Sequence, residues 1–284
     1  MKYLLFLLCL ISPTQSLYHH TDHILDRIQF NCVFIKDLSC EWKNDILVVD
    51  WLKDQPRDQL WVFNEHARER ITAEVALNVI QSLNSFKPEK RITIIPILNI
   101  WGRKEVEKGN TCLRKNSNGV DTNRNYQIKE KHHYNENSEE YEGPHPLSEK
   151  ETQLVSSILK DGVKRYINVH SGEFSMYMPY DSNSIRPPHA DKMIHFLKTI
   201  HPLCSQCKSG SAASVSFYKA YGTSVDYAIR IGVPEAYTFE IYGQETFRCE
   251  NMFNPKNTQK TVDTWTKILF TSAIDESLST VQQV

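Results

Sequence analysis

The pattern of hydrophobic and polar positions predicts strands that alternate with helices along the chain. Short apolar runs between polar turn residues predict strands at 46–51, 60–63, 91–98, 165–169 and 236–242. Apolar residues three or four positions apart predict helices at 18–28, 72–86, 148–160, 189–200, 223–231 and 258–273. This order predicts an α/β fold with a mixed, mainly parallel central sheet and helices on both faces. No linker divides the chain, so we expect a single domain.

Two local signals refine this prediction. Ser148 and Glu151 have the spacing of a capping box, which would open the helix at 148–160. Residues 99–125 show little periodicity and are rich in glycine and asparagine, so a long loop is expected there. Loops of that length inside a compact domain are usually functional or disordered.

The N-terminus differs from the rest of the chain. Lys2 precedes an apolar stretch at 4–11 and a small, polar stretch that ends at Ser16. This pattern predicts a signal peptide at 1–16 and a mature catalytic domain at 17–284. The apolar stretch is too short to span a bilayer, and we expect no membrane span elsewhere. The mature protein is therefore expected to be secreted, or delivered to a lysosome-like compartment.

The cysteines agree with export through the secretory pathway. Six remain after Cys9 is removed with the signal peptide, and six cysteines allow fifteen pairings. Cys32 and Cys40 are the nearest local pair. Cys204 and Cys207 have the spacing of a redox pair or half a zinc site, but no second cysteine pair accompanies them. A structural bridge is the preferred interpretation.

The charge balance excludes one broad class of partner. The 284 residues carry a formal net charge of −1, so there is no basic excess to displace counterions from nucleic acid. We therefore expect no nucleic-acid partner. Separately, we expect the protein to be a monomer.

Candidate chemistry gathers where the predicted strands end. His66 and Glu69 follow the strand at 60–63, His170 follows the strand at 165–169, and Glu240 lies in the last strand. Side chains at strand ends gather on one side of an open α/β sheet. Two histidines and a glutamate form the ligand set of hydrolytic zinc sites, with a fourth position left for water. Glu240 could then accept and deliver protons.

Several short motifs occur in the same order as in a known enzyme family. Arg114 opens an Arg-Lys-x-x motif, residues 119–125 read Gly-Val-Asp-Thr-Asn-Arg-Asn, and Glu240 ends a Thr-Phe-Glu stretch. With His66-Ala-Arg-Glu69, these motifs run in order through almost the whole mature chain. The sequence resembles the zinc metallocarboxypeptidases of the carboxypeptidase A/B type. The resemblance implies hydrolysis of the C-terminal peptide bond of peptides and proteins.

The resemblance assigns the metal and its supports. It implies that His66, Glu69 and His170 hold one Zn²⁺ per chain, with Asp121 orienting His66. Arg68 would support the site from one layer out.

It also assigns the catalytic pair. Glu240 would activate the attacking water, and Arg114 would polarise the scissile carbonyl and stabilise the developing oxyanion.

The resemblance also assigns a substrate-binding set. Asn123 and Arg124 would grip the terminal carboxylate of the substrate, a role that suits a planar guanidinium. Tyr218 would close over the terminal residue.

Specificity follows from the base of the side-chain pocket. Val225 would lie there, with Ala220 and Thr238 as neighbours, while the adjacent Asp226 would be structural. An apolar pocket predicts a preference for apolar or aromatic C-terminal residues.

Two alternatives remain open at this point. The same metal site could serve a zinc hydrolase of γ-glutamyl or cell-wall peptides, or the fold could be a non-catalytic peptide-binding module. Two charged residues that flank the ligands, Glu65 and Arg70, depart from the family's pattern and have no physical explanation in the sequence. Because the segment between the predicted signal peptide and His66 is short, we expect no N-terminal activation domain of the kind that many digestive members carry.

Overall fold

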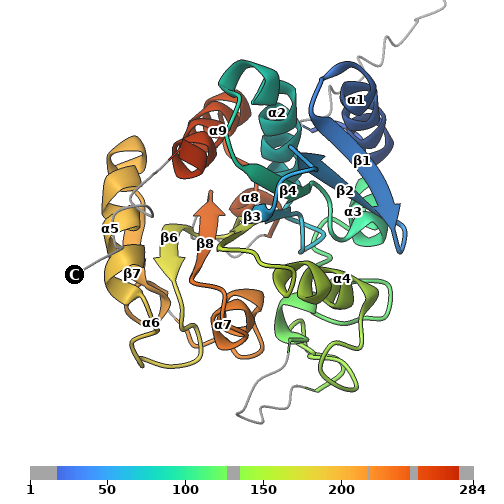
Figure 1. Ribbon diagram of the computed structural model, residues 1–284. Helices are drawn as coiled ribbons and strands as arrows, with labels where there is room; N and C mark the ends of the chain where they lie inside the picture. The colour runs from blue at the N-terminus through green and yellow to red at the C-terminus, as the bar shows by residue number, and fades with distance from the viewer. Residues whose placement is uncertain (1–17, 127–134, 217, 244–248, 275–284) are drawn as a thin grey trace, which may run out of the picture.

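An eight-stranded sheet crosses the centre of the protein, shown as a computed structural model in Figure 1. The structure describes residues 18–126, 135–216, 218–243 and 249–274. The signal peptide predicted at 1–16 lies outside the described residues. The strands are β1 Leu38–Lys43, β2 Ile46–Trp51, β3 Arg57–Phe63, β4 Arg91–Ile95, β5 Arg165–His170, β6 Phe174–Met178, β7 Lys208–Ser211 and β8 Glu235–Ile241.

The strand order is β1-β2-β4-β3-β5-β8-β6-β7. The four central strands β4, β3, β5 and β8 run parallel to one another. β1 and β2 are antiparallel to their neighbours, and β6 is antiparallel to β8 but parallel to β7. The predicted mixed, mainly parallel sheet is confirmed.

Helices cover both faces of the sheet. In Figure 1, α2 and α9 lie on one side of the strands, and α4 and α7 lie on the other. The described helices are α1 Thr21–Phe34, α2 Ile71–Phe86, α3 Ile100–Glu107, η1 Thr122–Arg124, α4 Lys150–Leu159, α5 Ala190–Ile200, η2 His201–Cys204, α6 Ala212–Val215, α7 Ser224–Arg230, α8 Cys249–Met252 and α9 Thr258–Ile274. The described chain forms a single α/β domain, as predicted.

Strand β5 shows why the central strands are nearly all apolar. All of its residues are buried, because helices cover both faces of the sheet. Its first residue, Arg165, is buried as well, but its side chain is charged. Both Arg165 and Glu235 have side chains that are 0% exposed, and Arg165 Nη2 lies 2.8 Å from Glu235 Oε2. This ion pair neutralises two charges inside the core.

The prediction of a loop throughout 99–125 is wrong in two places. The segment contains helix α3 and the short 3₁₀ turn η1. Helix α3 begins because the side chain of Asn99 accepts a hydrogen bond from Gly102 N–H at 2.8 Å. Only three of its residues are buried, Gly102, Arg103 and Val106, so the segment lacks the broad apolar stripe that signals a helix in sequence.

The predicted capping box is also wrong. Helix α4 begins at Lys150, and its N-cap Glu149 makes no side-chain capping bond. The Ser148 hydroxyl donates instead to the Glu149 carboxylate at 2.6 Å. In addition, the first helix extends to Phe34, beyond the predicted end at residue 28.

Three strands escaped prediction. β1 and β7 are the edge strands, where pairing on one side only relaxes the demand for apolar residues, whereas β6 is paired on both sides and four of its five residues are buried. β7 reads Lys-Ser-Gly-Ser and contains no apolar residue.

Three disulfides join the six described cysteines. Cys32–Cys40 and Cys204–Cys207 are the local bridges that the sequence favoured. Cys112–Cys249 links segments 137 residues apart, a pairing that the sequence left open.

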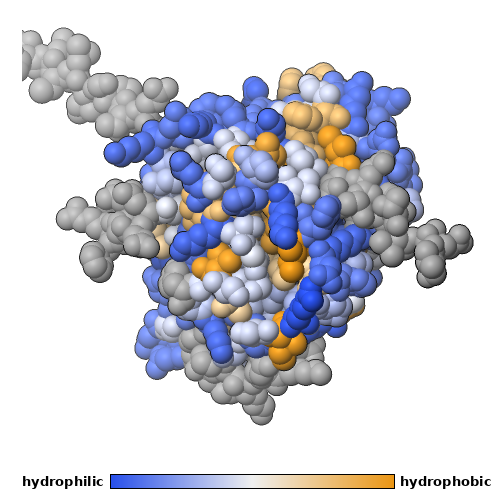
Figure 2. Space-filling model, turned by 90° about the vertical axis from the view of Figure 1, so that its left-hand side faces the viewer, coloured by the Kyte–Doolittle hydropathy of each residue, from blue (hydrophilic) through white to orange (hydrophobic). Residues whose placement is uncertain are grey.

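None of the described helices is long and apolar enough to cross a bilayer. On the face drawn in Figure 2, hydrophilic side chains dominate, and hydrophobic ones form small, separated patches among the residues that are coloured.

Candidate active site

The carboxyl ends of three neighbouring parallel strands bring the site together. β3 ends at Phe63, immediately before the segment that carries His66 and Glu69. His170 is the last residue of β5 and lies in register with Glu240 of β8. Because these parallel strands end side by side, all four candidate groups lie together at the carboxyl ends of the central strands, as expected.

A buried arginine sets the shape of the loop between β3 and α2. Asn64 takes a left-handed conformation (φ 50°), and its amide donates to the His66 carbonyl at 2.8 Å. Arg103, which is 0% exposed, donates to Asn64 Oδ1 at 3.2 Å and to the Arg70 carbonyl at 2.8 Å. The guanidinium of Arg70 lies 5.2 Å from the centre of the Tyr18 ring. Arg70 therefore has a structural role that the sequence did not explain.

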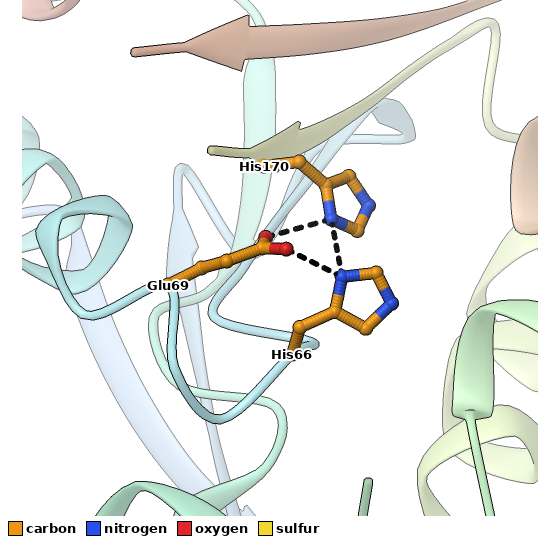
Figure 3. Close-up of side chains that lie close together, drawn as sticks. All are labelled: His66, Glu69 and His170. Carbon is orange, nitrogen blue, oxygen red and sulfur yellow. Dashed lines mark hydrogen bonds and ion pairs between the residues drawn. The ribbon is translucent and has the colours of Figure 1, made fainter. Parts of the chain in front are cut away.

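Three side chains point toward one another at this loop (Figure 3). His66 Nδ1 lies 2.7 Å from Glu69 Oε1, His170 Nδ1 lies 3.0 Å from Glu69 Oε2, and the two Nδ1 atoms are 3.2 Å apart. All three residues are buried. Two imidazole nitrogens and one carboxylate within 4.8 Å of one another match the donor set of a catalytic zinc ion. The residues present therefore fit the metal that the sequence predicted.

Each histidine turns its second nitrogen toward a carboxylate. His66 Nε2 lies 3.1 Å from Asp121 Oδ1, and His170 Nε2 lies 3.5 Å from Glu65 Oε2. The amide of Asn168 donates to the same Glu65 oxygen at 2.6 Å. Such partners fix the orientation and tautomer of a ligating imidazole. Glu65, whose charge was unexplained in sequence, is the counterpart of Asp121 on the other histidine.

The electrostatics of the three groups are strongly linked. Burial alone would raise the pKa of Glu69, but the charges of His66 and His170 outweigh it and lower that pKa. Burial would lower the pKa of His170, but the charge of Glu69 and hydrogen bonds to Glu65 and Glu69 raise it to about 10. His170 therefore holds a proton that a bound cation would displace.

Glu240 has the properties of a proton carrier. Its Oε2 accepts a hydrogen bond from Glu173 N–H at 3.3 Å, and its Oε1 accepts one from the Tyr177 hydroxyl at 3.5 Å. Burial, and then the negative charge of Glu69, raise the pKa of Glu240 to about 8. A carboxyl group that titrates near neutrality can both take up and release a proton during a reaction.

Asp121 joins the metal ligands to a guanidinium. Arg114 Nε donates to Asp121 Oδ2 at 2.7 Å, while the other carboxylate oxygen faces His66. Burial would raise the pKa of Asp121, but the charges of Arg114, His66 and Arg124 outweigh it and keep the carboxylate ionised. Arg114 is thereby held in the wall of the cavity, and its two Nη groups make no hydrogen bond to any of the described residues.

The predicted carboxylate grip lies in the same cavity. Arg124 Nη2 donates to Glu140 Oε1 at 2.7 Å and to the Tyr218 hydroxyl at 3.4 Å. Asn123 Oδ1 accepts from Ser224 N–H at 2.9 Å, which holds its side chain in place. Tyr218 is 42% exposed. Glu140 was not predicted, because nothing in its local sequence indicates that it contacts Arg124.

One cavity collects most of the predicted residues. The site residues that line it are His66, Arg68, Glu69, Arg114, Asn123, Arg124, His170, Tyr218, Ala220, Thr238 and Glu240. Arg68 is nearer to the cavity than predicted, and it donates to the Glu139 carboxylate at 3.1 Å.

Two predicted residues lie behind the lining. Asp121 contacts His66 and Arg114 from below, as expected of a supporting group. Val225 is 1% exposed, packs in the hydrophobic core, and is not among the described residues that line the cavity. The lining contains instead Asp181, Glu173 and Tyr177, which the sequence did not identify.

Comparison with known proteins places this site in a family. The model of the family described as zinc carboxypeptidase matches residues 56–267. The chain is 26% identical over 205 residues to mast cell carboxypeptidase A of Rattus norvegicus, covering 62% of this chain and 50% of that protein. It is 26% identical over 260 residues to carboxypeptidase A4 of Mus musculus, covering 81% of this chain and 62% of that protein. The chain thus spans about half the length of the curated relatives that it matches.

Solved structures share the fold. Bovine thrombin-activatable fibrinolysis inhibitor, in complex with a tick carboxypeptidase inhibitor, has a TM-score of 0.77 at 21% identity. That match covers 90% of this chain and 96% of the other. Carboxypeptidase A from Helicoverpa armigera has a TM-score of 0.78 at 18% identity, covering 90% of this chain and 73% of the other. The family match spans most of the chain and includes the His66, Glu69, His170 and Glu240 constellation, so the chain belongs to the zinc carboxypeptidase family.

Proposed function

We propose that this chain is a zinc-dependent carboxypeptidase that hydrolyses the C-terminal peptide bond of peptides and proteins. The observation that carries the proposal is the convergence of His66 Nδ1, Glu69 and His170 Nδ1 in a cavity that also contains Glu240 and Arg124. A metal-ligand set, a proton carrier and a carboxylate-binding cation are the three parts that this reaction requires.

The three ligands would hold one Zn²⁺, which supplies a Lewis acid and lowers the pKa of water. Glu240 takes the proton of the attacking water and returns it to the amine that leaves. Arg114, fixed by Asp121, directs its free N–H groups at the oxygen where negative charge develops. Each role is the one predicted from the sequence.

Selection of a chain end rests on Arg124. A guanidinium beside Asn123 and Tyr218 can bind a carboxylate through two parallel hydrogen bonds. An internal peptide bond has no such carboxylate, so substrate binding would favour peptide C-termini. The apolar or aromatic preference predicted from Val225 is not carried into this proposal, because Val225 does not line the cavity.

The proposal includes the predicted processing. Removal of residues 1–16 would leave a catalytic domain of 17–284, secreted or in a lysosome-like compartment. The three disulfides support an oxidising compartment. N-terminal sequencing of the protein recovered from a eukaryotic secretion host would test the cleavage site.

The decisive experiment is a panel of blocked dipeptides that differ in the C-terminal residue. Hydrolysis that is lost with a chelator, restored by Zn²⁺ and abolished in Glu240→Gln would support the proposal. Preference for γ-glutamyl or D-residue substrates would favour the alternative zinc hydrolase. Peptide binding without turnover by the zinc-loaded protein would indicate a non-catalytic binding module.

A further inference from the structure

A charged side chain is completely buried outside the cavity, and the proposed reaction does not use it. Arg103 of helix α3 is 0% exposed and is not among the described residues that line the cavity. Burial, and then the positive charge of Arg70, lower the pKa of Arg103 to about 10, so its guanidinium stays charged at neutral pH. A buried charge is stable only where partners replace the water that it has lost. The partners of Arg103 therefore indicate what it does.

Helix α3 lies very close to the loop that carries the metal ligands. A Cβ atom at Gly102 would lie 2.7 Å from Ala67 Cβ, so only glycine allows this approach. Ala67 belongs to the same loop as His66 and Glu69. The neighbouring side chain of Arg103 is thereby brought within hydrogen-bonding distance of that loop.

On one side, Arg103 holds the loop through an amide. Its Nη1 donates to Asn64 Oδ1 at 3.2 Å and to the Arg70 carbonyl at 2.8 Å. The first bond fixes the direction of the Asn64 amide. Asn64 Nδ2 then donates to the backbone carbonyls of His66 and Glu69, at 2.8 and 3.4 Å. Two of the three metal ligands are thus fastened by one amide, which Arg103 orients.

On the other side, Arg103 holds the N-terminal segment, His19 to Thr21. Its Nη2 donates to the His19 carbonyl at 3.0 Å. Two acids fasten the same segment. Glu74 Oε1 accepts from His19 N–H at 2.9 Å, and Glu107 Oε1 accepts from the N–H and the hydroxyl of Thr21, both at 2.8 Å. Arg103 lies 3.5 Å from each carboxylate, so its charge balances the acids that hold the segment.

We propose that Arg103 is a positioning residue of the metal centre, which couples the loop of His66 and Glu69 to the N-terminal segment. The inference rests on the zinc binding that the proposed function requires, and not on the identity of the substrate. Without Arg103 the Asn64 amide is free to turn, and the two ligand carbonyls lose their common donor. The loop must then be ordered when metal binds, which lowers the affinity. Because coupling is reciprocal, metal loading in turn orders the N-terminal segment.

The zinc affinity of Arg103→Met, measured in the full chain by competition with a chromophoric chelator, tests the positioning role. It should be roughly tenfold weaker than wild type, at the lower end of the range for residues that support ligands. Wild-type affinity in Arg103→Met would overturn the inference.

Arg165→Met is the matched control, because Arg165 is also 0% exposed and paired with a buried acid. Its partners Glu235 and Ser272 lie outside the ligand loop. Its zinc affinity should stay within about twofold of wild type, since distant sites without shared partners act independently. An equal loss of affinity in both variants would show that reduced stability is the cause, and would also overturn the inference.

Asn64→Gly tests the same link and leaves the cation between Glu74 and Glu107 in place. Asn64 has a φ of 50°, which glycine adopts freely, so only the amide is lost. Zinc binding should weaken as much as in Arg103→Met, and the double variant should bind no more weakly than either single one. Additive losses would mean that Arg103 does not act through Asn64. If Arg103→Met does not fold, wild-type affinity in Asn64→Gly overturns the inference.

Hydrogen exchange tests the coupling to the N-terminal segment without any substrate. The N–H groups of His19 and Thr21 donate to acids that contact Arg103. Addition of Zn²⁺ should slow the exchange of these amides severalfold in the wild type and not in Arg103→Met. Wild-type exchange that is the same with and without Zn²⁺ would overturn the coupling.

These measurements separate the inference from the proposed function. A wild-type chain that binds zinc and hydrolyses no peptide would end the carboxypeptidase proposal, while affinity and exchange would still decide the role of Arg103. Peptide hydrolysis by the wild type, with unchanged zinc affinity in Arg103→Met and Asn64→Gly, would overturn the coupling alone.

Discussion

The carboxylate of Glu140 forms an ion pair with the guanidinium of Arg124, with Glu140 Oε1 2.7 Å from Arg124 Nη2. Arg124 is almost completely buried, at 2% side-chain exposure, whereas Glu140 is 32% exposed. Under the proposed function, in which Arg124 binds the terminal carboxylate of the substrate, Glu140 and the substrate would compete for one cation.

Glu140→Gln should lower KM about threefold to tenfold with little change in kcat, because the substrate no longer displaces a charged competitor. Initial rates across a substrate series would measure this. Glu139→Gln is the control, since Glu139 pairs with Arg68 instead. A higher KM in Glu140→Gln would mean that Glu140 positions Arg124 and does not compete with the substrate.

Glu65→Gln should weaken zinc binding about 10- to 100-fold, as expected when the outer partner of a ligating histidine is lost. The amide can still accept the hydrogen bond from Asn168, so the local packing should survive. Competition with a chromophoric chelator measures the affinity. Asp121→Asn should have a comparable effect through His66. An affinity equal to wild type in Glu65→Gln would remove Glu65 from the metal centre.

The pH dependence of kcat/KM should report Glu240. Its ionised form is the active base, so activity is lost as pH falls through its pKa. That pKa is about 8 without metal, and a bound dication lowers it, so the acidic limb should lie below pH 8. The charge of Glu173 raises the pKa of Glu240, so Glu173→Gln should move the limb to lower pH. A shift to higher pH would contradict the electrostatic assignment.

Arg165→Met should reduce the free energy of unfolding by about 3 kcal/mol, because the buried carboxylate of Glu235 then keeps only the Tyr237 hydroxyl and the partly exposed Lys192 as partners. Urea denaturation measures the loss. The double variant Arg165→Met with Glu235→Leu should recover much of it, since both charges are then absent. If the double variant is no more stable than the single one, steric packing and not charge is the cause.

The metal centre could be predicted because its residues depend on local pattern. His66 and Glu69 are three residues apart, and His170 and Glu240 lie at the ends of strands that are recognisable in sequence. Parallel strands that end side by side then bring these residues together without further information.

Asp181 and Glu140 could not be predicted in the same way. Asp181 follows strand β6, which has no clear sequence signal, and its place depends on how that strand pairs with β8. Glu140 reaches Arg124 only through tertiary packing of an irregular segment. Val225 is a different case: the family motif placed it at the base of the pocket, and the structure buries its side chain in the core, so its role in specificity stays a prediction.

The Cys112–Cys249 bridge has a consequence for how the protein is produced. Cys112 is two residues before Arg114, and Cys249 begins α8, which leads to the cavity residues Met252 and Phe253. Protein made in a reducing cytoplasm would lack this tether, yet the metal ligands lie at strands and a loop held by other contacts. Such material should load zinc normally and turn over slowly, so metal content alone would be a misleading measure of preparation quality.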